Sequence, residues 1–171
     1  MPAPLPHDHL PPVPSFTVTS DDLTDGGRVP DAQVFDDWGQ TGGNLSPQLS
    51  WSGFPDGTQG FAITCFDPDA PTGSGFWHWV LFDIPASVTS LPTGAGTAGT
   101  EVGVHGRNDY GIKAYGGAAP PPGPAHRYVF TVHALDVGSL GIDSDTSAAV
   151  AGFNITAHTL ARATLVATYS S

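Results

Sequence analysis

The sequence has few cations and almost no cysteine. Five Lys and Arg stand against sixteen Asp and Glu, which gives a formal net charge of −11. Binding to nucleic acid or to an anionic membrane surface needs clustered cations, so neither role is expected. Cys65 is the only cysteine, which excludes an intramolecular disulfide. No run reaches the about 18 apolar residues of a membrane span, so no integral membrane segment is expected.

The first fourteen residues lack hydrophobic periodicity and are rich in proline. They have neither a cationic start nor an apolar core, so they do not resemble a signal peptide, and a cytoplasmic location is expected. The segment 1–14 is predicted to be a proline-rich N-terminal arm, mobile or loosely docked. The remaining residues, 15–171, have a length that suits one domain.

Glycine and proline are abundant, at 22 and 17 residues, and they cluster between apolar runs. Such punctuation is typical of a β-rich protein with long loops. Alternating or continuous apolar runs predict strands at residues 16–19, 49–51, 61–66, 76–84, 127–135 and 162–169. Residues 146–160 predict two short helices, broken at Gly152 and Asn154. The whole indicates a mostly β sandwich or barrel with one or two short helices near the C-terminus.

Three polar residues occupy positions where apolar ones would be expected. Asp67 follows the strand 61–66, His78 lies within the most apolar strand, and His126 begins the strand that continues through Tyr128. Period-two counting puts His78 on one face with Val80 and Phe82. Buried polar groups cost about 1–3 kcal/mol when unpaired, so the three are expected to meet at one end of neighbouring strands. A carboxylate that accepts from an imidazole would leave the other ring nitrogen for a ligand.

Plainer interpretations stand beside this one. A single histidine in a strand is more often structural than functional, and Asp67–Pro71 alone could be a turn. An Asp/His/His set could form an open zinc site, but the spacing does not favour it over a metal-free pocket. No phosphate-binding loop, dinucleotide motif or serine-hydrolase elbow is present, and no cofactor is expected. His7 and His9, with Asp8, are expected to be at most an adventitious metal site in a flexible tail. His105, His133 and His158 are expected to be structural or surface residues, and Cys65 a buried structural thiol.

Several motifs follow one another in a familiar order: SPQLSW at 46–51, DPDAP at 67–71, WHW at 77–79, Tyr115-Gly116, PPPG at 120–123 and HRYVF at 126–130. Together they resemble the phosphatidylethanolamine-binding protein family, also called Raf-kinase-inhibitor-like, and most of all its short bacterial and archaeal branch. The resemblance implies a sandwich of two antiparallel sheets, a possible homodimer, and a small surface pocket for phosphate or phosphorylated head groups. The pocket residues that it carries over are Asp67, Asp69, His78, His126 and Tyr128.

Two departures from the family pattern concern the pocket rim and the C-terminus. Residues 116–119 read GGAA where the family often has a Gly-Pro step, and the long C-terminal extension of eukaryotic members is absent, so kinase-inhibitor biology is not carried over. We expect a non-enzymatic binding protein for a small anionic or phosphorylated ligand, with no catalytic residue, metal or cofactor. One alternative is an inhibitor or signalling module whose pocket captures a protease, kinase or other protein partner. Another is a phosphoester hydrolase that uses Asp67 and a histidine as acid and base, although no nucleophile is evident.

Overall fold

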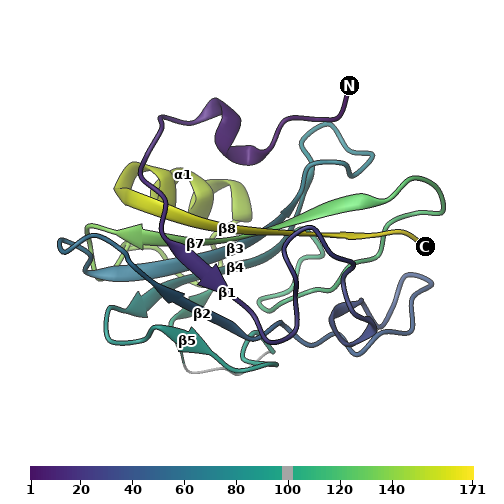
Figure 1. Cartoon of the computed structure of the whole chain (residues 1–171), viewed down its shortest axis with the longest axis horizontal. Helices are drawn as coiled ribbons and strands as arrows, with labels where there is room; N and C mark the ends of the chain where they lie inside the picture. Colours follow the sequence, from purple (N-terminus) through teal and green to yellow (C-terminus); the bar gives the residue numbers. More distant parts are fainter. Residues whose placement is uncertain (98–101) are drawn as a thin grey trace.

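The computed structural model, which describes residues 1–97 and 102–171, is a sandwich of two antiparallel sheets (Figure 1). The larger sheet has the strand order β6-β4-β3-β7-β8, and the smaller has the order β1-β2-β5. The strands are β1 Thr17–Thr19, β2 Leu49–Ser52, β3 Gly60–Asp67, β4 Phe76–Pro85, β5 Ser90–Leu91, β6 Val104–His105, β7 His126–Leu135 and β8 Thr159–Tyr169. The two-sheet antiparallel architecture expected from the sequence is confirmed.

The larger sheet is apolar on both faces because each face is covered. One face packs against the smaller sheet, where Ile63 of β3 and Trp51 of β2 belong to the same buried cluster. The other face packs against the helix α1, where Val80 of β4 meets Ile155. This double coverage explains why β3, β4 and β7 are almost continuously apolar, as central strands buried on both sides must be.

The segment after β7 forms one continuous helix, α1 (Ala148–His158). The prediction of two short helices, broken at Gly152 and Asn154, was wrong. Ser147 caps it by accepting a hydrogen bond from the backbone N–H of Val150. Gly152 costs about 1 kcal/mol of helix propensity relative to alanine, but the buried face that includes Ala151 and Ile155 packs on the sheet and outweighs that cost.

The N-terminal segment lies on the same side of the larger sheet as α1 (Figure 1). It contains a short 3-10 helix, η1 (Pro6–His9), and a second, η2 (Asp31–Gln33), comes later in the chain. His7 Nε2 lies 3.2 Å from Thr131 Oγ1 of β7, and the Arg127 guanidinium donates to the carbonyl of Ala3. Residues 1–14 therefore contact the outer face of β7.

The stretch 91–123 is mostly irregular, as expected, but it contains the end of β5 and all of β6. Residues 98–101 of that stretch lie outside the described residues. No helix in the described part of the chain is both long enough and apolar enough to cross a bilayer.

Candidate functional site

A pocket of about 580 Å³ lies where β3 ends and where β4 and β7 begin. These strands are antiparallel neighbours, so the C-terminal end of β3 meets the N-terminal ends of the other two. Four of the five site residues expected from the sequence line this pocket: Asp67, His78, His126 and Tyr128. The fifth, Asp69, does not line it.

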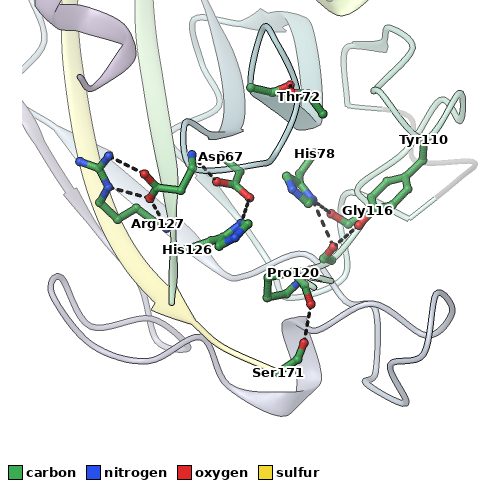
Figure 2. A network of polar contacts seen from close by, with 12 residues as sticks. Asp67, Thr72, His78, Tyr110, Gly116, Pro120, His126, Arg127 and Ser171 are labelled. Carbon is green, nitrogen blue, oxygen red and sulfur yellow. Dashed lines mark hydrogen bonds and ion pairs between the residues drawn. The ribbon is translucent and has the colours of Figure 1, made fainter. Parts of the chain in front are cut away.

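Asp67 holds His126 in one orientation. His126 Nδ1 lies 2.7 Å from Asp67 Oδ2, and the backbone N–H of Asp69 donates to Asp67 Oδ1 at 2.8 Å (Figure 2). Burial raises the pKa of Asp67, and the hydrogen bond from His126 opposes that rise. Because Nδ1–H donates to the carboxylate, Nε2 is the ring nitrogen of His126 left for a ligand. Both carboxylate oxygens of Asp67 are already engaged, so Asp67 positions His126.

A β-bulge turns His78 into the pocket. In the pairing of β3 with β4, Cys65 is opposite Trp79 and Phe66 is opposite Trp77, so His78 is the extra, unpaired residue. Val80 belongs to the cluster beneath α1, whereas His78 lies in the pocket. The prediction that His78 shares a face with Val80 and Phe82 was therefore wrong, because the bulge breaks the period-two alternation.

His78 is buried and uses one ring nitrogen internally. Its Nδ1 lies 3.0 Å from the carbonyl oxygen of Gly116 and 3.1 Å from that of Gly117, so Nδ1 carries the proton and donates to both (Figure 2). Burial lowers the pKa of His78 to about 4, and the two carbonyl contacts only partly oppose this. The ring is neutral near pH 7, and Nε2 presents a lone pair that can accept a hydrogen bond.

Tyr128 brings a hydroxyl group to the same pocket. Its side chain is 2% exposed, and its buried OH has no hydrogen-bond partner among the described residues. The rings of Tyr128 and His78 meet edge to face with centroids 5.1 Å apart. Burial raises the pKa of Tyr128 above its ordinary value, so the hydroxyl remains a donor at any ordinary pH.

Asp69 lies in the turn after β3 and pairs with Arg127 instead of lining the pocket. It accepts from the Arg127 backbone N–H at 2.9 Å and from the guanidinium at two points, each 2.8 Å. The Arg127 hydrogen bonds hold the pKa of Asp69 below its usual value. This bidentate pair ties the turn after β3 to the first residues of β7.

Aromatic residues at the rim of the pocket were not predicted as site residues. Trp38, Phe76 and Tyr110 line it, together with prolines 71 and 120–122. Tyr110 is fixed because its hydroxyl donates to the carbonyl of Gly117 at 2.8 Å. The only sequence signal for Trp38 and Tyr110 was the presence of large aromatic residues inside loops rich in Gly and Asp.

Two hydroxyl groups that line the pocket are committed to backbone carbonyls. Thr72 Oγ1 donates to Gly75 O at 2.6 Å, and Ser171 Oγ donates to Pro120 O. No lysine or arginine lines the pocket in the described residues. Gln40 Nε2 donates to Ser171 Oγ at 2.8 Å, and the Tyr110 hydroxyl donates to Gly117 O. The other polar side chains of the described lining are the two imidazoles, the Tyr128 hydroxyl and the Asp67 carboxylate.

Three of the other histidines make structural contacts. His105 Nε2 accepts from Trp79 Nε1–H at 3.0 Å, His133 Nε2 lies 2.9 Å from Thr64 Oγ1, and His158 contacts Asp136 at 2.8 Å. Across residues 1–97 and 102–171, no three His, Cys, Asp or Glu side chains gather in a way that could hold a metal ion.

Comparison with known proteins identifies the family of this chain. The phosphatidylethanolamine-binding protein family model matches residues 19–170. The UPF0098 protein YbhB of Escherichia coli K12 is 47% identical over 154 residues, 88% of this chain and 98% of YbhB. The UPF0098 protein YbcL of the same organism is 46% identical over 160 residues, 91% of this chain and 87% of YbcL.

Solved structures agree with the sequence matches. The crystal structure of E. coli YbcL, a new member of the mammalian PEBP family, superposes with a TM-score of 0.88 at 44% identity, covering 92% of this chain and 99% of YbcL. That of CT736 from Chlamydia trachomatis, a putative phosphatidylethanolamine-binding protein homolog, gives 0.78 at 26% identity, covering 92% and 98%. A match over nearly the whole domain, in sequence and in fold, shows that the chain belongs to the phosphatidylethanolamine-binding protein family.

Proposed function

We propose that the protein binds a small phosphorylated ligand in the pocket, without catalysing a reaction on it. The observation that carries the proposal is the buried Tyr128 hydroxyl, which has no partner among the described residues and lies in a pocket with two histidines. Buried polar groups normally find partners, so a free donor on a residue that lines a pocket favours an oxygen-bearing ligand. The hydroxyls of Thr72 and Ser171 are engaged by backbone carbonyls, which does not favour either as a nucleophile.

The hydrogen-bonding character of the pocket favours the monoanion of a phosphomonoester over the dianion. Tyr128 donates, whereas neutral His78 can only accept at Nε2, since its Nδ1–H is used internally. A phosphate monoanion supplies both an oxygen acceptor for Tyr128 and a P–OH donor for His78. The absence of lysine and arginine from the described lining also disfavours a second negative charge.

A titration across pH tests the proposal with methyl phosphate, read by NMR shifts or calorimetry. The second pKa of a phosphomonoester is about 6, so the monoanion fraction falls about tenfold per pH unit above that value. We expect affinity to fall in parallel between about pH 6 and pH 8, and binding to be lost in His126→Ala. Wild-type protein that binds no methyl phosphate at any pH would overturn the proposal and favour a protein partner instead.

A matched ligand and a matched variant isolate the contribution of His78. Dimethyl phosphate is a monoanion without a P–OH group, so it should bind about tenfold or more weakly than methyl phosphate at about pH 5.5. In His78→Asn the amide can still donate to the carbonyls of Gly116 and Gly117, but no atom replaces Nε2. The preference for methyl phosphate should then disappear. Equal binding of both ligands by the wild-type protein would contradict the role assigned to His78.

A further inference from the structure

The pocket is larger than a phosphate group needs, and most of its wall is apolar. Its volume of about 580 Å³ falls within the range of about 300–1,000 Å³ typical of sites for drug-sized ligands. Three of its polar residues, His78, His126 and Tyr128, come from the first residues of β4 and β7, the two strands that flank β3. The rest of the lining includes the rings of Trp38, Phe76 and Tyr110 and the prolines at 71 and 120–122.

The aromatic residues form a continuous row from the surface to the polar groups. Trp38 meets Tyr110 with ring centroids 4.7 Å apart, Tyr110 meets His78 at 5.4 Å, and His78 meets Tyr128 at 5.1 Å. Phe76 contacts both Trp38, at 6.1 Å, and His78, at 5.0 Å. In Figure 2, Tyr110 lies on the far side of His78 from His126. An apolar group attached to a bound phosphate can therefore lie along this row.

Trp38 stands at the outer end of the row and is poorly explained by packing of the fold. Its side chain is 61% exposed, and its φ of 53° is in the left-handed region, which bulky residues rarely adopt. The Asp37 side chain accepts from the Trp38 backbone N–H at 2.8 Å and so supports this turn. A large, exposed aromatic ring held against a pocket offers contact area to a ligand at little cost in side-chain entropy.

We propose that the pocket selects aryl phosphomonoesters, with the phosphate at the histidines and Tyr128 and the aromatic group against Trp38, Phe76 and Tyr110. This inference rests on the proposed function, because it assigns the body of the same ligand. A cationic body could also pair with aromatic rings. The walls favour a neutral ring, because the only side-chain carboxylate in the described lining is that of Asp67, whose oxygens are both engaged. The aryl group can belong to a free small molecule or to a phosphotyrosine.

The test compares phenyl phosphate with methyl phosphate in calorimetric or NMR titrations at about pH 5.5. Wild-type protein should bind phenyl phosphate about tenfold or more tightly than methyl phosphate, because the ring leaves water for an apolar wall. Trp38→Ala should reduce this ratio towards one, and Trp38→Phe should retain most of it. Phe153→Ala removes an aromatic ring that is 77% exposed on α1, outside the pocket, and should leave the ratio unchanged.

The outcomes separate the two proposals. Binding of methyl phosphate with no preference for phenyl phosphate would overturn the aryl assignment and leave the proposed function standing. Binding of neither ligand would remove the proposed function, and the aryl assignment with it. Tighter binding of phosphocholine than of phenyl phosphate would replace the aryl group with a cationic one. N-acetyl phosphotyrosine amide distinguishes the sources: binding tighter than that of phenyl phosphate favours a phosphotyrosine, and weaker binding favours a free aryl phosphate.

Discussion

Replacing Tyr128 with phenylalanine should have opposite effects on folding stability and on ligand binding. The hydroxyl is buried without a partner in the described residues, and an unsatisfied buried polar group costs about 1–3 kcal/mol. Removing it should raise the free energy of unfolding of the unliganded protein by about 1 kcal/mol, although most substitutions lower it by about that amount. A hydrogen bond to a charged group is worth about 1.5–3 kcal/mol, so the affinity for methyl phosphate should fall about 10- to 100-fold.

Tyr115 supplies the matched control for this experiment. It is also a buried tyrosine, at 3% exposure, but its hydroxyl donates to the backbone carbonyl of Gln33 at 2.7 Å. Tyr115→Phe should therefore lower the free energy of unfolding by about 1 kcal/mol. Urea unfolding in phosphate-free buffer measures stability, and titration with methyl phosphate measures affinity. A Tyr128→Phe protein that is less stable than wild type, or that binds methyl phosphate equally well, would refute the reasoning.

Two further predictions concern residues around the site. Burial lowers the pKa of His105 to about 4, so its stabilising contribution is complete above its unfolded-state value of about 6.5 and is lost as the pH falls towards 4. In His105→Gln the amide oxygen can still accept the hydrogen bond from Trp79, but the side chain does not titrate. Between about pH 7 and pH 5.5, the free energy of unfolding measured with urea should fall by about 1 kcal/mol more in wild type than in this variant. Equal losses would contradict this. A Cβ at Gly117 would collide with neighbouring backbone, so Gly117→Ala should cost about 1–3 kcal/mol and displace a carbonyl that holds His78. A Cβ at Gly73 would meet open space, so Gly73→Ala should leave thermal stability and methyl phosphate affinity nearly unchanged. A similar loss of stability in both variants would exclude the steric explanation.

Most strands could be predicted because their signal is local. The nearly continuous apolar character of β3 and β7 follows from burial on both faces, and His126 and Tyr128 fall on one face by simple counting. His78 shows the limit of counting. Nothing in its own strand marks the bulge, which arises from the pairing of β4 with β3, and this pairing is a property of two segments together. Asp67 and His126 were expected to meet, and they do.

The rim of the pocket could not be predicted for a different reason. Trp38 and Tyr110 come from loops far apart in the sequence, and loops carry no periodic pattern that assigns their side chains to a face. The helix α1 shows the same competition between local and tertiary effects. Gly152 has a low helix propensity and so favours a break, whereas packing against the sheet stabilises a continuous helix.

The turn after β3 constrains how this protein can change length over evolution. Asp67 pairs with His126 on one face of β7, and Asp69 pairs with Arg127 on the other. Asp67 ends β3, and the pairing of β3 with β7 fixes its position, so inserting or deleting one residue after Asp67 would displace Asp69 from Arg127. The ion pair that ties this turn to β7 would be lost, together with the backbone N–H that Asp69 donates to Asp67 Oδ1. The spacing of the two acids therefore sets the length of the turn, because one acid holds a pocket histidine and the other anchors the turn on the neighbouring strand.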